Sequence, residues 1–460
     1  MTRVFDLVIR NAQLALGDGL SSGSIAVQDG RIAAIGDGFD GAEVIDAKGL
    51  WALPGGIDSH CHIDQPGDEA RGMDSWASAS RAALCGGTTT VLPFAMPEPG
   101  QSGPLDAVAR ALARSKGASV VDYGLHAVLL PGLDADLPAL FAGLTGMGVS
   151  SIKLFLTYDG YAVPDPDILR IMDLAAQSGI AVMLHAESDL IIGYMAERLR
   201  AAGKTGLEWH PVLHHPAAEQ DATCRMAAYA EVTGAEIVVL HVSSERALGE
   251  ITAAAGRDVR VLAETCPQYL FGQDAPPEHR LFSPPARGDA DRRALWQALA
   301  RGDIALWSSD HSPSMRAAKY GQDVFTATSG VPGLETRLPL LFSEGLLAGR
   351  ISLPRYLDLA GAAAARRFGL GASKGRIAPG YDADLVLWDP GHRWTIDPGQ
   401  QQSRTDYCPY AGMQLTGKPV TALLRGQTVL QGGEIAQPTG RYLPRDSAKP
   451  THSVLKDPAA

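Results

Sequence analysis

Two histidines, His60 and His62, lie at the end of the run LWALPGGIDSHCH, which is mostly apolar up to Asp58. Side chains two residues apart on a strand point to the same side, so these two imidazoles can share one metal ion. Two histidines that only hydrogen-bond within a loop are the alternative interpretation of so short a motif. The other candidate residues of the chain favour the metal.

Three further side chains of the metal-ligating kind end separate apolar runs: His185 ends VMLH, His241 ends VVLH, and Asp310 ends LWSSD. If these runs are parallel strands of one barrel, their carboxyl ends meet at one mouth. Imidazole and carboxylate groups are the ligands that divalent zinc, manganese or iron take in proteins. The spacing therefore predicts a metal centre without thiolate ligands.

Lys153 begins the run KLFLTY and lies where this metal centre is expected. A lysine ammonium is cationic and has no lone pair for a metal, so a salt bridge at the barrel mouth is one interpretation. The other interpretation is a lysine that has reacted with carbon dioxide. Its carbamate is an anion whose two oxygens can bridge two metal ions.

A barrel is predicted by the alternation of strand-like and helix-like runs between Pro54 and Gly371. The helix-like runs PDPDILRIMDLAAQSG and ADRRALWQALARG each end in glycine, which is typical of a helix C-terminus. Eight strand-then-helix units predict an α/β fold, a (β/α)8 barrel of the TIM type, with a doubly wound sheet as the alternative. No glycine-rich phosphate loop follows a strand, so nucleotide binding is not expected. Besides the run before His62, the strand-like runs are TTTVLPFAM, YGLHAVLL, SSIKLFLTY, IAVMLHAES, EIVVLHVSS, VRVLAETCP and DIALWSSDH.

The two ends of the chain share a different pattern of short β-type runs and Gly-rich turns. Neither end has enough apolar surface to fold alone, so we expect residues 1–53 and 372–440 to form one β-sandwich domain. Residues 54–371 are the predicted barrel domain. Residues 441–460 are polar and are expected to be a C-terminal tail, either mobile or laid over a neighbouring subunit.

Composition excludes several classes of partner. The 460 residues include 40 Lys and Arg against 51 Asp and Glu, a net charge of −11, and no basic block suited to nucleic acid. The five cysteines show no CxxC spacing, which argues against a disulfide framework. No signal peptide and no apolar run of about 18 residues is found, so we expect a cytoplasmic protein without a membrane partner.

Eight motifs along nearly the whole chain resemble those of the cyclic amidohydrolases, most closely the dihydropyrimidinases and D-hydantoinases. They occur in the family's order: GGIDSHCHIDQP, KLFLTYDG, MLHAES, VLHVSS, AETCPQYL, SPPARGDADRRALW, SSDHSP and SGVPGLETRLPLLFSEG. The resemblance implies hydrolysis of the ring amide of a dihydropyrimidine or a 5-substituted hydantoin, giving an N-carbamoyl amino acid. It also implies a homotetramer and two divalent metal ions, usually Zn2+. One ion would be held by His60, His62 and Asp310, the other by His185 and His241, with carboxylated Lys153 bridging them.

The resemblance assigns catalytic and substrate-binding roles as well. A metal pair acidifies water, and Asp310 would take the proton on attack and return it to the leaving ring nitrogen. Tyr158 would donate to the oxyanion, and Ser283 and Ser329 would bind the amide edges of the cyclic amide or ureide substrate. Rim packing for Tyr158 and loop capping for the serines are the alternatives. The family usually has asparagine at the position of Ser329. A narrower or altered preference among ring substrates is therefore one alternative for this chain.

Three other histidines lie near these motifs. His214 and His215 stand where the family commonly has a serine–arginine pair, and we interpret both as surface residues without a metal. His311 follows Asp310 and is expected beside the site or in the core rather than as a ligand.

Two alternative functions differ in class. An allantoinase would act on another ureide ring. A collapsin-response-type scaffold would keep the fold without its metal ligands, but this chain retains all six ligand-type residues.

Overall fold

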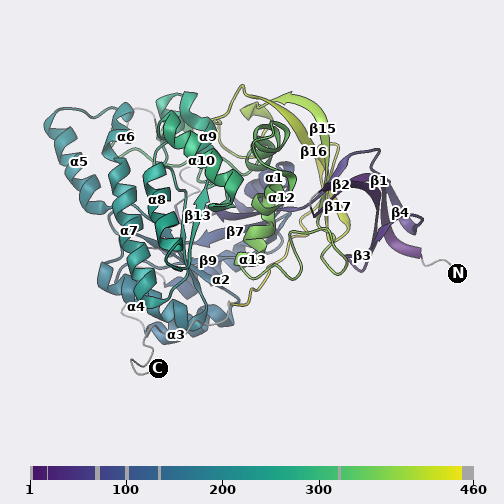
Figure 1. Cartoon of the computed structure of the whole chain (residues 1–460), viewed down its shortest axis with the longest axis horizontal. Helices are drawn as coiled ribbons and strands as arrows, with labels where there is room; N and C mark the ends of the chain where they lie inside the picture. Colours follow the sequence, from purple (N-terminus) through teal and green to yellow (C-terminus); the bar gives the residue numbers. More distant parts are fainter. Residues whose placement is uncertain are drawn as a thin grey trace.

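The computed structural model describes residues 4–17, 19–67, 73–98, 103–132, 136–319 and 323–447. Two nine-stranded sheets organise it, one forming a parallel barrel and the other built from both ends of the chain. Figure 1 shows the barrel with its helices on the left and the second sheet, called here the terminal sheet, on the right.

The barrel strands follow one another in the order β14-β13-β12-β11-β10-β9-β7-β6, with the short β8 (Asp122–Tyr123) paired to β7. Most of these strands are buried along their whole length, as expected for parallel strands covered on both faces. The predicted (β/α)8 barrel is therefore confirmed. Its strands are β6 (Gly56–Cys61), β7 (Thr88–Ala95), β9 (His126–Val128), β10 (Ser151–Phe155), β11 (Ala181–His185), β12 (Ile237–Val239), β13 (Val261–Thr265) and β14 (Ile304–Trp307).

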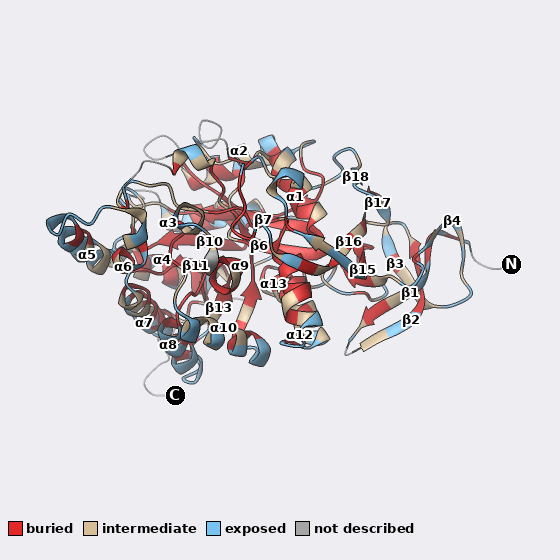
Figure 2. Ribbon diagram, turned by 90° about the horizontal axis from the view of Figure 1, so that it is seen from above, coloured by how far each residue is buried: buried red, intermediate tan, exposed pale blue. Residues whose placement is uncertain are grey.

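Helices cover the outside of the barrel, and Figure 2 shows that their outer faces are exposed whereas the strands that they cover are buried. The helix α4 (Asp165–Ser178) ends at Gly179 with φ 65°, and α10 (Asp289–Arg301) ends at Gly302 with φ 97°. Both ends confirm the glycine C-caps expected from the sequence. The other helices with ten or more residues are α1 (Trp76–Cys85), α2 (Pro104–Ser115), α3 (Leu137–Gly146), α5 (Asp189–Ala201), α7 (Pro216–Thr233) and α8 (Glu245–Ala255).

Shorter α-helices are α6 (His210–Leu213), α9 (Pro267–Phe271), α11 (Arg337–Leu340), α12 (Leu353–Leu357) and α13 (Ala363–Arg367). A π-helical stretch (Leu341–Leu347) continues α11, and another (Asp358–Ala362) joins α12 to α13. Among the described residues, no helix is both long enough and apolar enough to cross a lipid bilayer.

The barrel closes where β6 meets the end of β14. Cys61 and His311 form a parallel bridge, and the Asp310 amide donates to the His60 carbonyl at 3.0 Å. Below this contact the carboxylate of Asp58 accepts from the Ser309 amide at 3.2 Å. Closure therefore brings the ends of the first and last strands into contact.

One predicted strand is two strands in the structure. The run before His62 divides at Gly55 into β5 (Trp51–Pro54), which belongs to the terminal sheet, and β6 of the barrel. A Cβ at Gly55 would lie 2.1 Å from Thr89 Oγ1, so only glycine lets the chain pass this closely from one sheet to the other.

The terminal sheet has the order β18-β17-β16-β15-β5-β1-β2-β3, with β4 paired to β1. Its core combines residues from both ends of the chain, such as Leu7 and Ile25 with Leu385 and Leu423. The predicted composite of the two ends is thus confirmed, as one mixed sheet. Its strands are β1 (Val4–Leu16), β2 (Gly19–Gln28), β3 (Arg31–Gly36), β4 (Asp40–Asp46), β5, β15 (Leu385–Thr395), β16 (Gln414–Leu424), β17 (Gln427–Gln431) and β18 (Glu434–Ile435).

The segment 441–447 differs from the expected tail. Tyr442 forms a bridge with Tyr123, and the buried Arg445 donates to Ser151 Oγ and to the Leu125 carbonyl. This part of the expected tail packs on the chain's own barrel, because the Arg445 guanidinium donates to acceptors at the start of β10 and just before β9. The rest of the expected tail, 448–460, lies outside the described residues.

Candidate metal centre at the barrel mouth

Three predicted ligands come together directly. His60 Nε2 lies 2.9 Å and His62 Nε2 lies 3.6 Å from the same oxygen, Asp310 Oδ1. The ligand atoms of these three residues all lie within 4.8 Å of one another. Because His60 lies in β6, His62 directly follows that strand and Asp310 follows β14, this cluster is a product of barrel closure.

The remaining two histidines continue the cluster across the mouth. The ring centroids of His60 and His241 are 5.5 Å apart, and those of His241 and His185 are 4.6 Å apart. His185 ends β11, and His241 follows β12. The four imidazoles thus form a continuous row, as expected from three strands, β6, β11 and β12, whose carboxyl ends converge.

Lys153 lies beside this row in an apolar environment. Its Nζ is 5.0 Å from the ring centroid of Phe94 and 4.7 Å from that of Phe155, and the residue is 1% exposed. The Phe94 ring also packs 5.0 Å from His60 and 5.3 Å from His62. Within the described chain, no carboxylate lies within 4 Å of the ammonium, so the salt bridge expected as one interpretation is not formed.

The ring nitrogens are arranged for a cation. Glu264 Oε1 lies 2.6 Å from His60 Nδ1, and since a carboxylate only accepts, Nδ1 carries a proton and Nε2 is the nitrogen that faces Asp310. That Nε2 is buried without a hydrogen bond although Asp310 is close to it, and His241 Nδ1 is also buried without one. An imidazole nitrogen without a hydrogen bond beside a carboxylate, as at His60 and Asp310, fits a metal ion that both would bind.

The charges around His60 also favour a cation at this point. Burial opposes protonation of His60, but the carboxylates of Glu264 and Asp310 outweigh it and raise the pKa of His60 to about 9. The buried carboxylate pair therefore draws positive charge to this point, which a divalent ion supplies.

The backbone is strained at three of the predicted site residues. Tyr158 has φ 82°, His241 has φ 40° and Asp310 has φ 48°, all in the left-handed region that side chains with a Cβ disfavour. Each such residue costs on the order of 1–3 kcal/mol and persists only where its surroundings fix it. The strain marks the turns that aim these side chains into the mouth.

Tyr158 and the two predicted serines form one wall of the mouth. The Tyr158 ring packs 5.0 Å from His185, and Ser283 Oγ lies 3.5 Å from Ser329 Oγ. Burial raises the pKa of Tyr158 well above its usual value, assisted by the charge of Glu187. Its phenol therefore stays protonated and can act as a donor.

Lys319 supports this wall and is not indicated by any motif. Its buried Nζ donates to the carbonyls of Leu281 and Gly330, which lie two residues and one residue from the two serines. A lone lysine in a sequence does not reveal that its ammonium serves backbone carbonyls, so sequence reasoning misses it.

The prediction for His214 is wrong, whereas His215 is exposed as expected. His214 is 6% exposed, and its Nδ1 lies 3.0 Å from Glu187 Oε1. The other Glu187 oxygen, Oε2, lies 2.9 Å from His185 Nε2. The buried glutamate explains why a histidine in this position turns inward.

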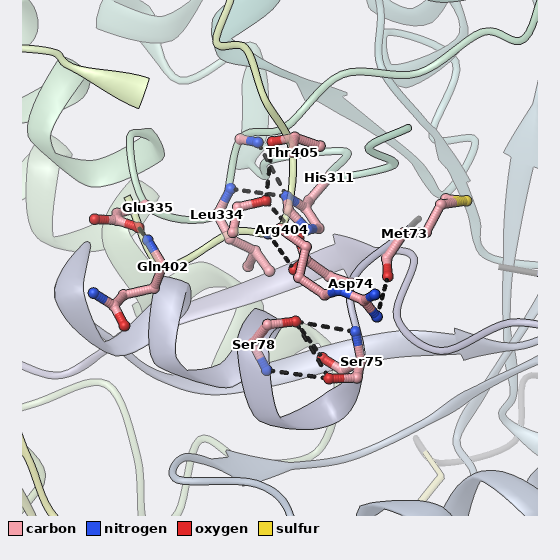
Figure 3. Close-up of polar contacts among 12 residues, drawn as sticks. Met73, Asp74, Ser75, Ser78, His311, Leu334, Glu335, Gln402, Arg404 and Thr405 are labelled. Atoms are coloured by element: carbon pink, nitrogen blue, oxygen red, sulfur yellow. Dashed lines mark hydrogen bonds and ion pairs between the residues drawn. The ribbon is translucent and has the colours of Figure 1, made fainter. Parts of the chain in front are cut away.

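His311 is buried beside the site as expected, where it joins several loops (Figure 3). Its Nδ1 accepts from the Gly333 amide at 3.1 Å, and its Nε2 lies 3.0 Å from Asp74 Oδ2. Burial would raise the pKa of Asp74, but its hydrogen bonds, led by that from His311, lower the pKa to about 2. Asp74 also accepts from Ser403 Oγ and the Arg404 amide.

Comparison with known proteins agrees with this geometry. The model of a family described as the amidohydrolase family matches residues 51–429. A D-hydantoinase of Ralstonia pickettii is 36% identical over 96% of this chain and 100% of its own length. An allantoinase of Rubrobacter xylanophilus is 34% identical over 95% of this chain and 97% of its own length.

A solved structure of a D-hydantoinase superposes with a TM-score of 0.92 at 35% identity, and the match covers 96% of this chain and 99% of that one. The similarity thus extends over both the barrel and the terminal sheet. The chain belongs to the amidohydrolase family.

Proposed function

We propose that this protein opens the ring of a 5-substituted hydantoin or a dihydropyrimidine by hydrolysis, giving an N-carbamoyl amino acid. That it is a cyclic amide hydrolase follows from its family and from its D-hydantoinase relatives. The observation that carries the proposal is the row of four imidazoles with Asp310 and Lys153 at one barrel mouth.

The proposed cofactors are two divalent ions, with Zn2+ suited to the imidazole and carboxylate donors. When bound, such a pair acidifies water and polarises the ring carbonyl. One ion would be held by His60, His62 and Asp310, and the other by His185 and His241.

Lys153 in carboxylated form is proposed as the bridging ligand. Its Nζ lies over the rings of Phe94 and Phe155 and forms no ion pair with any described residue, and an unpaired buried ammonium is costly. Reaction with carbon dioxide replaces that cation by an anion beside the site, which suits two dications.

The remaining residues act on the substrate and the proton. Asp310 Oδ2, which accepts from Gln268 Nε2 at 3.2 Å, is the proposed base that takes a proton from water and returns it to the ring nitrogen. Tyr158 would donate its phenol proton to the oxyanion. Ser283 and Ser329 would contact the amide edge of the ring, held in place by Lys319.

Further expectations remain proposals. They include a homotetramer, a cytoplasmic location, and a division into a terminal-sheet domain (1–53 and 372–440) and a barrel domain (54–371). Allantoin hydrolysis is the second candidate activity, because one relative with 34% identity is an allantoinase.

The test is ring opening measured in parallel on phenylhydantoin, dihydrouracil, allantoin and dihydroorotate with the zinc-loaded protein. We expect the hydantoin or the dihydropyrimidine to have the highest kcat/KM. A preference for allantoin would replace the proposal by the second candidate. No turnover of any ring by protein with two bound ions would contradict both.

A further inference from the structure

The glutamate between His185 and His214 has a histidine on each of its oxygens. Glu187 Oε2 lies 2.9 Å from His185 Nε2, and Oε1 lies 3.0 Å from His214 Nδ1. All three side chains are buried, and Glu187 is 0% exposed.

The contact with Glu187 determines which nitrogen of His185 is free. A carboxylate only accepts, so His185 Nε2 must carry the proton and Nδ1 keeps the lone pair that a metal needs. The same logic assigns the proton of His214 to Nδ1. Without the His214 donor, Glu187 Oε1 would be a buried anionic oxygen that has lost a hydrogen bond. The carboxylate would then no longer be held in the orientation that presents Oε2 to His185.

His214 is itself held from three sides. Its amide donates to the His210 carbonyl at 3.0 Å, and its carbonyl accepts from Arg287 Nη1 at 2.5 Å. Its ring packs against that of His210, with centroids 4.5 Å apart. Through His210 Nε2, 2.9 Å from the Phe282 carbonyl, the same segment reaches the wall that carries Ser283.

We propose that His214 is a positioning residue that, through Glu187, fixes the tautomer and ring orientation of His185. It thereby sets how tightly the ion shared by His185 and His241 is held. The inference rests on the proposed metal site. Partners of metal-ligating histidines typically change metal affinity by about 10–100-fold when they are removed.

Metal release is the direct test, because a merely structural role would not change it in a folded protein. Wild type and variants are loaded with two equivalents of Co2+, and a chelator in excess removes the ions while the visible spectrum is recorded. We expect His214→Leu to lose one of its two ions about 10–100-fold faster than wild type, with an altered spectrum.

Two other substitutions make the test specific. His214→Asn places an amide N–H near the position of Nδ1, and we expect it to restore slow release. His215→Asn is the matched control, because His215 is exposed and an asparagine keeps an acceptor for the Ala217 amide. It should release metal like wild type.

The outcomes distinguish failure of the role proposed for His214 from failure of the proposed metal site. Equal release rates for wild type and His214→Leu would overturn the inference while leaving the metal site intact. Wild type that binds fewer than two ions would overturn the proposed metal site itself. If His214→Leu does not fold, Glu187→Gln takes its place. Only one of the two polar atoms of a glutamine amide, the oxygen, can accept a hydrogen bond, so this side chain cannot accept from both histidines. Release as slow as in wild type would again overturn the inference.

Discussion

Carboxylation of Lys153 should depend on how burial changes its amine. Burial in the apolar environment lowers the pKa of Lys153 from 10.5 to about 8, although nearby Asp310 and Glu264 oppose the shift. At pH 7 about one amine in ten is then neutral, against roughly one in 3000 for an exposed lysine. The structure therefore makes the reactive form about 300-fold more abundant.

The reaction consumes this neutral amine. Its nitrogen forms a bond to the carbon of CO2, and one proton leaves to solvent, so carboxylation should increase as pH rises through 8. Metal-free protein incubated with 13C-bicarbonate should show a carbamate signal in its 13C NMR spectrum. Metal added with bicarbonate should restore activity faster than metal added without it.

Substitution separates the carbamate from a simple structural role. Lys153→Ala should lose nearly all activity, to below about one hundredth of wild type, because no anion bridges the ions. Acetate or propionate added with metal should restore part of the rate, since a short carboxylate can replace the carbamate oxygens. Lys153→Arg should not be rescued, because its cation still fills the space. Wild-type turnover and metal content in Lys153→Ala would refute the reasoning.

Three further predictions concern the catalytic wall and the stability of the fold. Tyr158→Phe should lower kcat by about 10²–10³-fold with little change in KM, and steady-state kinetics with an unchanged kcat would contradict its donor role. Arg337→Met leaves the buried Asp58, 3.5 Å away, without its cation and should cost about 3–5 kcal/mol, seen as an earlier urea midpoint. Burial raises the pKa of Glu335 from 4.5 to about 7, so its stability contribution is present below pH 4.5 and lost as pH rises through 7. Glu335→Gln keeps an acceptor for the Gln402 amide, so it should melt higher than wild type at pH 8 but not at pH 4, where thermal scans can compare them.

The sequence predicts the features that depend on chain order and periodicity. Apolar runs that end in His185, His241 and Asp310 predict both the strands and the place where their ends meet. The glycine after α4 and the pairing of the two chain ends follow from local patterns in the same way.

Features that depend on three-dimensional neighbours are not predicted. His214 faces inward because a buried Glu187 lies 27 positions earlier in the chain, and no local pattern signals that pairing. Glu187 and Glu264 themselves carry a weak signal, since each stands at or just after a predicted strand end. The division at Gly55 depends on the close approach of Thr89, which only the folded backbone reveals.

The central claim is that the cluster at the barrel mouth is a two-metal centre that opens a cyclic amide. Its most direct test is to titrate metal-free protein, kept in bicarbonate, with Zn2+ while following ring opening of the best substrate. The account predicts no turnover without metal and a rate that rises until two ions are bound per chain. Full activity in the metal-free protein, or saturation at one ion, would contradict it.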